Sequence, residues 1–336
     1  MSPKWNSDRL NTILKKFKGK KILVIGDVGI DRYTIGTVER ISPEAPVPIV
    51  RVEEEKFKLG LAANVADNIH SLGGVAFLTG IIGKDRAAED FRKLLNSAKI
   101  NATHLIADQS RRTVLKERIV SDRQQLLRVD YENGHAMSSS VEKKVIAQIR
   151  ALIPRCDAVI LQDYAKGMLT AQLVDAVFSS AKKVGKTVAV DPNPRSAVEL
   201  YLGASVLTPN TKEAEKLSGV KILDSKSLLL AGRKILDATK AQHVVITRGR
   251  DGMAIFSAGS KGVQMIPTYA REVYDVSGAG DTVVTVLALA LASGATIVES
   301  AILGSLAAGV VVGKRGTATV SQDELRTSMA FFETLS

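Results

Sequence analysis

The segment Asp275–Thr282 reads DVSGAGDT and runs directly into the apolar stretch VVTVLALALA, which predicts a buried helix. Gly278 and Gly280 allow the backbone to turn tightly and to approach a ligand without interference from a Cβ atom. The amides at 278–281 are the unpaired donors of the helix N-terminus and, with the helix dipole, form an anion site. Asp281 stands inside that site, where a carboxylate can accept the proton of a hydroxyl while the amides hold a phosphoryl group. The alternative is a glycine turn with Asp281 as a favourable charge at the helix start.

On both sides of this segment, short apolar runs alternate with helical patterns. Lys21–Gly26 (KILVIG) predicts a buried strand, and 62–72 predicts a helix that Gly73-Gly74 ends. Strands separated by helices of about 10–15 residues indicate a mostly parallel sheet covered on both faces, a three-layer α/β sandwich. Further strands are expected at 75–79, 158–162, 187–191, 205–208 and 243–247, a hairpin at 252–267, and helices at 85–97, 141–152, 171–184, from 212, at 226–238 and, as the last two, near 280–292 and 298–313.

Two segments break this alternation. Residues 33–58 contain three prolines and then an extended run, residues 113–131 consist of two β-rich runs, and neither contains a helix. We expect them to pair into a small antiparallel sheet, called the lid here because such a sheet beside a ligand site closes over substrate in many enzymes. A decorative edge sheet is the alternative. The α/β domain then comprises 1–32, 59–112 and 132–336.

Composition narrows the class of protein. The chain has 336 residues, 45% of them apolar, which is enough for a large core, and its single Cys156 excludes a disulfide framework. Neither an apolar signal segment nor a membrane-spanning run is present, so we expect a cytoplasmic protein without a membrane partner. The net charge of +11 suggests nucleic acid, but the basic residues are spread out and aromatic residues make up only 4%. An excess of basic charge also suits anionic small substrates such as sugar phosphates and ATP.

A second motif follows the strand at 205–208. Asn210 and Glu213 form the pattern of a capping box, with Asn at the N-cap and Glu three residues later. The same oxygen-rich corner could hold Mg²⁺ through water, and both readings can hold together. No P-loop occurs, and the first strand is not followed by G-x-G-x-x-G. A Rossmann dehydrogenase is therefore disfavoured.

Four motifs together resemble the ribokinase/PfkB carbohydrate kinases over nearly the whole chain. They are GDVGIDRY at 26–33, LGLAAN at 59–64, TPNTKEAE at 208–215 and DVSGAGDT at 275–282, and their order and spacing also match. The resemblance implies a ribokinase-like fold with a β lid and often a dimer through the lids. An exposed apolar lid edge would otherwise be a liability, which supports the same expectation of a homodimer.

The resemblance also implies roles for individual residues. Asp281 would be the catalytic base, and the amides of Gly278, Ala279 and Gly280 would form the anion hole. The nucleotide and its metal would meet Asn210, Glu213 (Mg²⁺ through water), Thr247, Gly249 and Gly252. Asp275, Ser277 and Gly316 lie where the superfamily often holds a monovalent cation such as K⁺. The implied cofactors are ATP and Mg²⁺.

A further set of segments is similar to the heptose 7-phosphate kinases within this family. It consists of RISPEAPVPIV at 40–50, QQLLRVD at 124–130, DYAKG at 163–167 and GTATV at 316–320. These kinases often carry a nucleotidyltransferase domain as well, which we would expect from another polypeptide here. The similarity implies transfer from ATP to the anomeric hydroxyl of D-glycero-D-manno-heptose 7-phosphate, a step toward ADP-heptose and the lipopolysaccharide core.

Sugar recognition is expected from residues of several motifs. Asp31, Gly60, Asn64, Asp163 and Asn193 would lie at the sugar, and cations are needed for its phosphate, because a buried phosphate must be paired. Lys166, just past a strand end, and the lid residues Lys116 and Arg118 are the candidates.

Two departures from the heptose pattern leave the exact sugar open. Leu61 replaces a usual glycine, and DPNPR follows 190 where DPKG is typical. Another sugar or sugar-acid kinase is therefore the alternative enzyme. A sugar-binding regulator without turnover is the alternative of another class, against which the intact DVSGAGDT and NTKE segments argue.

Overall fold

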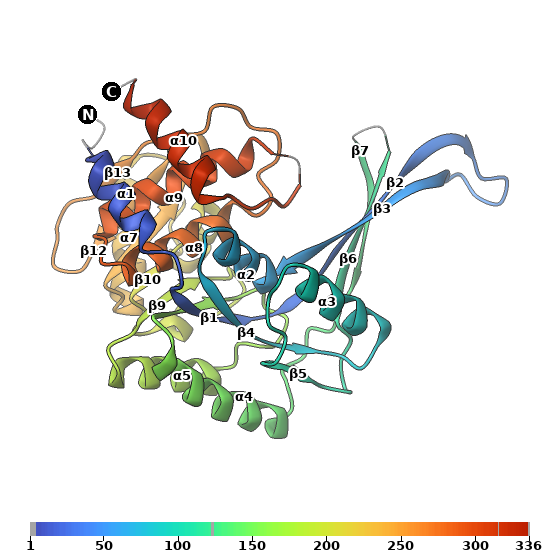
Figure 1. Ribbon diagram of the computed structural model, residues 1–336, viewed down its shortest axis with the longest axis horizontal. Coiled ribbons are helices and arrows are strands. Elements are labelled where there is room, and N and C mark those ends of the chain that lie inside the picture. Colours follow the sequence, from blue (N-terminus) through green and yellow to red (C-terminus); the bar gives the residue numbers. More distant parts are fainter. Residues whose placement is uncertain (1–4, 122–123, 315, 335–336) are drawn as a thin grey trace.

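One large mixed sheet forms the centre of the molecule. The computed structural model describes residues 5–121, 124–314 and 316–334. The strands of this sheet are β1 (Lys21–Gly26), β4 (Val75–Ile82), β5 (Leu105–Ala107), β8 (Ala158–Gln162), β9 (Thr187–Asp191), β10 (Val206–Leu207), β11 (His243–Thr247), β12 (Met253–Ser257) and β13 (Gln264–Ile266). Within the described residues their order is β13-β12-β11-β10-β9-β8-β1-β4-β5 (Figure 1). Pairs from β11 to β5 are parallel, and β12 and β13 add antiparallel pairs at one edge.

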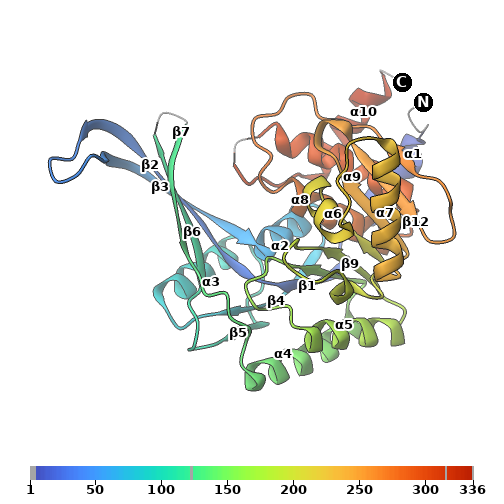
Figure 2. The same ribbon diagram turned by 180° about the vertical axis from the view of Figure 1, so that it is seen from behind.

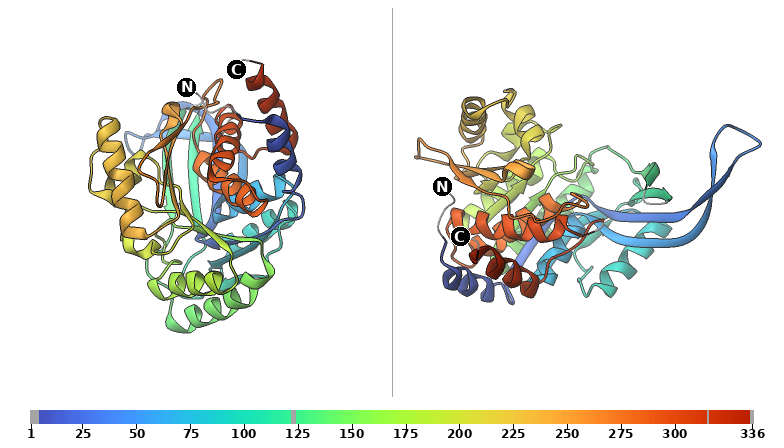
Figure 3. Two further views of the ribbon diagram at one scale, coloured as in Figure 1. Left: turned by 90° about the vertical axis from the view of Figure 1, so that its left-hand side faces the viewer. Right: turned by 90° about the horizontal axis from the view of Figure 1, so that it is seen from above.

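Helices cover both faces of this sheet, as the end-on view in Figure 3 shows. On one face lie α1 (Ser7–Lys15), α2 (Ala62–Ser71), α3 (Arg86–Ser97), α8 (Ala279–Ala292), α9 (Ile297–Val312) and α10 (Gln322–Glu333). On the other face lie α4 (Ser139–Leu152), α5 (Ala171–Lys183), α6 (Thr211–Ser218) and α7 (Ser225–Thr239) (Figure 2). The expected three-layer sandwich with a mostly parallel sheet is confirmed.

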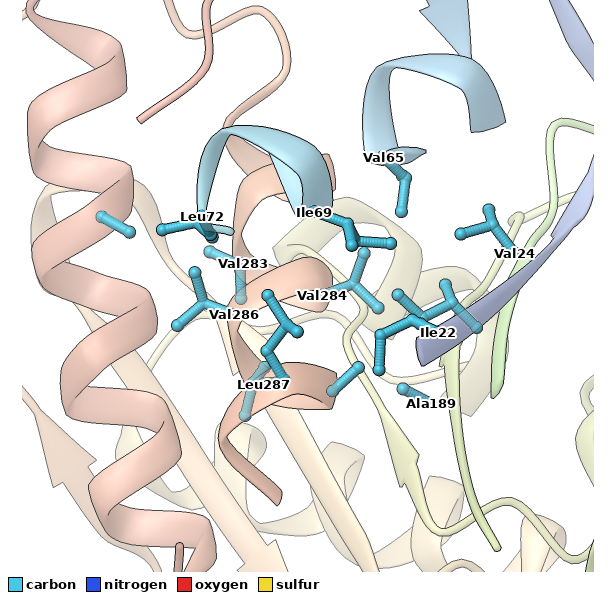
Figure 4. Packing of buried hydrophobic residues seen from close by; sticks show 14 of the residues in the cluster. Ile22, Val24, Val65, Ile69, Leu72, Ala189, Val283, Val284, Val286 and Leu287 are labelled. Carbon is cyan, nitrogen blue, oxygen red and sulfur yellow. The ribbon is translucent and has the colours of Figure 1, made fainter. Parts of the chain in front are cut away.

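Strand β1 shows why two cores form. Its side chains alternate, so that Ile22 and Val24 join the core under α2 and α8, whereas Leu23 and Ile25 join the core under α4 and α5. Figure 4 shows Ile22 and Val24 facing the apolar side chains of α2 and α8. Burying each such side chain stabilises the fold by about 1.5–3 kcal/mol. This packing fixes helix α8, at whose start the DVSGAGDT segment lies.

A second sheet stands off the sandwich as a long twisted ribbon (Figure 1). Its strands are β2 (Val28–Ile41), β3 (Pro48–Leu61), β6 (Val114–Ser121) and β7 (Gln124–Tyr131), in the order β3-β2-β6-β7. These four strands are called the lid from here on. Part of the turn between β6 and β7 lies outside the described residues.

The expectation of an antiparallel lid was wrong for its central pair. Strands β2 and β6 pair in parallel, although β2–β3 and β6–β7 are antiparallel. Both central strands leave the sandwich at the same place and run outward, and each returns through its own hairpin. Parallel pairing at the centre follows from that geometry. The strands also reach further into the sandwich than expected, beginning at Val28 and ending at Leu61.

The expectation that two helices close the chain was also wrong, since α10 follows them. A capping box of Ser321 and Glu324 begins it, and Leu325 and Met329 bury its inner face. The Ser-x-x-Glu pattern before an apolar periodicity was the signal that could have located this helix. Among the described residues, no helix has the length and apolar character needed to cross a bilayer.

Candidate active site

The start of helix α8 forms an open anion site. Gly278 is the N-cap with φ 82°, a left-handed conformation that suits glycine. The N–H of Ala279 donates to Val276 O at 3.3 Å, and no acceptor for the N–H groups of Gly280 and Asp281 is found in the described parts of the chain. A Cβ atom added at Gly280 would meet nothing closer than 4.0 Å. A phosphoryl group therefore has both donors and room at this helix end.

Asp281 is buried beside these donors and is held by three neutral side chains. Asn64 Nδ2 donates to its Oδ2 at 2.7 Å, and Gln162 Nε2 and Tyr164 OH each donate to its Oδ1 at 2.8 Å. Burial raises the pKa of Asp281 to about 6, although the hydrogen bonds from Asn64 and Tyr164 lower it. A carboxylate with this pKa is ionised at neutral pH and still basic enough to accept a hydroxyl proton in a transition state.

Gln162 connects Asp281 to a second buried carboxyl group, that of Asp191. Its Nε2 donates to Asp191 Oδ2 at 2.6 Å as well as to Asp281. Gln162 ends β8 and Asp191 ends the neighbouring strand β9, so parallel pairing places the two side by side. Burial, together with the charges of Glu213 and Asp281, raises the pKa of Asp191 well above its usual value.

The roles of Gln162, Tyr164 and Asp191 were missed from sequence. Each stands at or just past the carboxyl end of an apolar parallel strand, the edge at which open α/β sheets bind ligands. That position was the available signal. Burial, with the nearby charges of Asp281 and Asp191, raises the pKa of Tyr164 well above its usual value, so its hydroxyl is a hydrogen-bond donor at neutral pH.

The sugar residues expected from the first half of the chain meet at the base of the lid. Asp31 on β2 is buried, and its Oδ1 accepts a hydrogen bond from Arg118 Nη1 on β6 at 2.6 Å. Gly60 lies against it, because a Cβ atom there would be 3.0 Å from Asp31 Oδ2. The charge of Asp31 also raises the pKa of Asp281, to which Asn64 donates its hydrogen bond.

Of the three cations expected at a substrate phosphate, two already have acid partners. Arg118 pairs with Asp31, and Lys166 Nζ donates to Glu132. Lys116 makes no ion pair among the described residues; its ammonium lies 5.8 Å from the centre of the Tyr164 ring. Burial lowers the pKa of Lys116, although the nearby charge of Asp31 raises it. Lys116 is therefore the cation that an incoming anion can pair with at least cost.

Asp163 and Asn193 lie in the turns that support this site. Asp163 Oδ2 accepts hydrogen bonds from Ser196 Oγ at 2.6 Å and from Tyr201 OH at 2.7 Å. Asn193 Nδ2 donates to the backbone oxygen of Asp163 at 3.3 Å, and its N–H donates to Tyr201 OH. These contacts fix the segments that follow β8 and β9.

Asp27 anchors the DYAKG turn from below. Its carboxylate accepts the N–H groups of Lys166 and Met168 at 3.0 and 3.1 Å. Burial raises the pKa of Asp27 to about 6. These hydrogen bonds connect the residue after β1 to the backbone of Lys166.

The residues expected at the nucleotide lie together beyond β10 and β11. Asn210 and Glu213 form a complete capping box at the start of α6, with Glu213 N donating to Asn210 Oδ1 at 3.0 Å and Asn210 N to Glu213 Oε2 at 2.8 Å. Asn210 also forms a bridge with Thr247. Gly249 and Gly252 have φ 55° and 75°, and a Cβ atom at Gly252 would lie 2.0 Å from Ile266 O, so only glycine fits there.

Glu213 also faces the acidic rim of the site. Burial raises its pKa, and its charge raises that of Asp191. Carboxylate oxygens are the ligands that Mg²⁺ prefers, so the donor set fits this ion. The described residues contain no group of three or more His, Cys, Asp or Glu that could hold a metal ion. A magnesium ion would therefore need phosphate oxygens and water as further ligands.

Asp275, Ser277 and Gly316, expected at a monovalent cation, also lie together. Ser277 N donates to Asp275 Oδ1 at 2.9 Å and Gly316 N to Asp275 Oδ2 at 3.0 Å. Both carboxylate oxygens thus already accept a hydrogen bond. The N–H groups from these two loops, together with the nearby charge of Arg118, lower the pKa of Asp275.

The chain is similar in sequence to two bacterial proteins of the same name. The chain is 42% identical to the Bifunctional protein HldE of Desulfatibacillum aliphaticivorans, over 93% of this chain and 64% of the relative. It is also 42% identical to the protein of that name from Geobacter sulfurreducens, over 92% and 63%. The chain thus spans less than two thirds of the length of these relatives.

Solved structures and a family model extend the comparison. A putative ribokinase from Agrobacterium tumefaciens is 23% identical with a TM-score of 0.75, over 94% of this chain and 99% of that one. Escherichia coli phosphofructokinase-2, solved in complex with potassium, is 20% identical with a TM-score of 0.76 over the same shares. The model of the pfkB family carbohydrate kinases matches residues 19–324. The chain therefore belongs to the pfkB family of carbohydrate kinases.

Proposed function

We propose that this protein is an ATP-dependent kinase that phosphorylates the anomeric hydroxyl of D-glycero-D-manno-heptose 7-phosphate. The observation that carries the kinase proposal is Asp281, a buried carboxylate with a pKa raised to about 6 beside the open N–H groups of a helix start. The segments similar to the heptose 7-phosphate kinases support the choice of sugar. A cytoplasmic location and assembly into a homodimer through the lids belong to the same proposal.

In the reaction, Asp31 and Asn64 hold hydroxyl groups of the sugar beside Asp281. The Asp281 carboxylate accepts the proton of the reacting sugar hydroxyl. At the same time the hydroxyl oxygen forms a bond to the γ-phosphorus of ATP, and the bond from that phosphorus to the β–γ bridging oxygen breaks. The N–H groups at the start of α8 stabilise the charge on the transferring group, since phosphoryl transfer depends on positioning and electrostatics. ADP and the sugar bisphosphate leave, and Asp281 releases its proton to solvent.

Magnesium would be held by Asp191 and Glu213, directly or through water, together with phosphate oxygens. When bound, it would supply positive charge that neutralises the phosphates of the nucleotide. The hydrogen bond from Gln162 fixes the Asp191 side chain relative to the base.

The phosphate at the far end of the sugar would pair with Lys116. Its ammonium is half-buried over Tyr164, whose hydroxyl contacts the base, so it lies within one sugar length of the reacting group. A kinase for an unphosphorylated sugar would have less use for a half-buried cation that forms no ion pair among the described residues.

Another sugar or sugar-acid kinase of the family is the second candidate, and Leu61 is the observation that favours it. This leucine has φ 58°, a conformation that glycine adopts without strain, and it caps helix α2 next to Gly60. A side chain here, where the family's usual pattern has a glycine, favours a change in the sugar that is bound. A regulator without turnover is disfavoured, because Asp281, its partners and the anion site are all in place.

Release of ADP from ATP by the purified chain, measured with a panel of sugars and sugar phosphates, tests the proposal. We expect turnover with heptose 7-phosphate and, by phosphorus NMR, a product phosphorylated at the anomeric carbon. The Asp281→Asn variant, purified in the same way, controls for contaminating kinases. Equal efficiency on sugars with and without a phosphate would refute the heptose phosphate proposal and favour the second candidate.

A further inference from the structure

A lysine of the lid reaches the loop that borders the anion site. Lys58, near the end of β3, donates a hydrogen bond from Nζ to the backbone oxygen of Thr317 at 2.5 Å. Its ammonium also lies 5.8 Å from the centre of the Tyr33 ring. Thr317 in turn packs over Gly278, since a Cβ atom at Gly278 would be 3.5 Å from Thr317 Cγ2. Thr317 thus lies between Lys58 and Gly278, the N-cap of α8.

This position matters because an acid from the segment before α8 contacts the same loop. The Asp275 carboxylate accepts the N–H of Gly316, and Lys58 donates to the carbonyl of the next residue, Thr317, so the two charged groups contact adjacent residues of one loop. A negative charge at the entrance to an anion site opposes the binding of phosphate. Burial lowers the pKa of Lys58, while Asp275 and then Asp31 raise it, so Lys58 is a cation that faces Asp275.

A monovalent cation at this turn is what the resemblance to the carbohydrate kinases implies, and the E. coli neighbour was solved with potassium. The residues here fit such an ion poorly. Both oxygens of Asp275 accept backbone N–H groups, and the carbonyl of Thr317 accepts the Lys58 ammonium. A second cation beside that ammonium would also be repelled.

We propose that the Lys58 ammonium supplies, from the lid, the positive charge beside Asp275 that a bound potassium ion would otherwise supply, so that turnover does not require K⁺. The inference rests on the proposed kinase function. It also links the lid to the anion site, because Lys58 belongs to β3 and contacts Thr317.

The same strand offers a matched control. Lys56 is two residues away, so its side chain leaves β3 on the same face as that of Lys58. It is exposed and pairs with Glu54 at 2.9 Å. Lys56→Met removes an equal charge from the lid without touching the Asp275 turn.

Turnover in potassium chloride against tetramethylammonium chloride gives the first test. We expect the wild type and Lys56→Met to turn over equally in both salts. Lys58→Met should lose about tenfold or more in tetramethylammonium, the scale of one charge-assisted hydrogen bond, and recover in part in K⁺. Activation of the wild type by K⁺, or a loss in Lys58→Met that K⁺ does not restore, would overturn the proposal.

A crystallographic readout separates this inference from the proposed function, because it needs no turnover. Crystals of the wild type and of Lys58→Met, soaked in rubidium chloride, would be compared by anomalous scattering. We expect a rubidium peak beside Asp275 in the variant and none in the wild type. A peak in the wild type, or no peak in either protein, would overturn the proposal even if the kinase activity is confirmed.

Discussion

Carboxylates lie both at the rim of the sandwich, meaning the carboxyl ends of β8 and β9 with the start of α8, and on the inner face of the lid. The surroundings of these carboxylates differ between the two regions. At the rim, Asp281 and Asp191 contact amide and hydroxyl groups, and burial raises their pKa values. In the lid, Asp31 contacts a guanidinium group, and Lys58 and Lys116 are its neighbours on the adjacent strands. The rim is suited to moving a proton, and the lid is suited to recognising charge.

The lid arrangement follows from strand register. Lys58, Asp31, Lys116 and Asp130 are cross-strand partners in one row over all four strands, so basic and acidic residues alternate across the sheet. Opposite charges on directly facing residues stabilise such a sheet. The proposed substrate phosphate, paired with Lys116, would extend this alternation.

The largest effect is expected when Asp281, the proposed catalytic base at the rim, is replaced. Asp281→Asn keeps the shape and removes the proton acceptor, so turnover should fall by at least about 10², the lower end for loss of a general base. ATP should still bind, because the helix start is unchanged. Asp237→Asn, an exposed acid on α7, is the control. Near-normal turnover of the Asp281 variant, by initial rates, would reject the assignment.

The next effect separates charge recognition from catalysis. Lys116→Met should weaken the binding of a phosphorylated sugar by about 1.5–3 kcal/mol, the range for a hydrogen bond to a charged group. The binding of an unphosphorylated analogue should be unaffected. Lys166→Ala should have the smaller effect, because Glu132 already neutralises that ammonium. Equilibrium binding of both sugars decides the matter. If the two sugars weaken equally, Lys116 does not contact the phosphate.

A smaller effect is expected at the metal corner. Glu213→Gln should raise the Mg²⁺ concentration needed for half-maximal turnover by about tenfold, as for other groups that hold a metal or its water. If Glu213 serves only in the capping box, the variant should instead lose about 1 kcal/mol of stability with an unchanged Mg²⁺ dependence. A Mg²⁺ titration beside a thermal melting curve distinguishes these outcomes.

The smallest effect is expected at the outer face of the lid, where a substitution should change assembly rather than the fold. Phe57, Leu127 and Tyr131 point away from the charged row and are 38%, 54% and 38% exposed. Such a face on an isolated sheet favours pairing with a second copy. Light scattering should show a dimer, and Leu127→Glu should shift it to a monomer while changing the stability of the fold by no more than about 0.5 kcal/mol. A monomeric wild type would contradict this prediction.

The sequence was most informative where local pattern and tertiary structure agree. The apolar run of β1 and the glycines of the DVSGAGDT segment predicted a strand and a helix start that the structure contains. Asn210 and Glu213 likewise form the capping box that their spacing indicates. These features depend on neighbours along the chain, so they are readable without the fold.

Features that depend on strand order could not be read in this way. The bridge from Gln162 to Asp191 and Asp281 exists because β8 and β9 are adjacent and α8 lies over their ends, and no local pattern specifies that adjacency. The contact of Lys58 with Thr317 joins residues 259 positions apart. The parallel pairing of β2 and β6 depends in the same way on where both strands leave the sandwich.

The central claim is that a buried acid without a cation partner, Asp281, is the base, and the pH dependence of kcat/KM tests it most directly. An acceptor must be deprotonated, so kcat/KM should be level above neutrality and fall about tenfold per pH unit below about pH 6. A substrate phosphate ionises in the same range, so the Tyr164→Phe variant is measured in parallel. The hydrogen bond from Tyr164 lowers the pKa of Asp281, so its loss in the variant should raise that pKa and move the acid limb to higher pH. An acid limb caused by the substrate phosphate would stay in place. An acid limb at the same pH in both proteins would contradict the account.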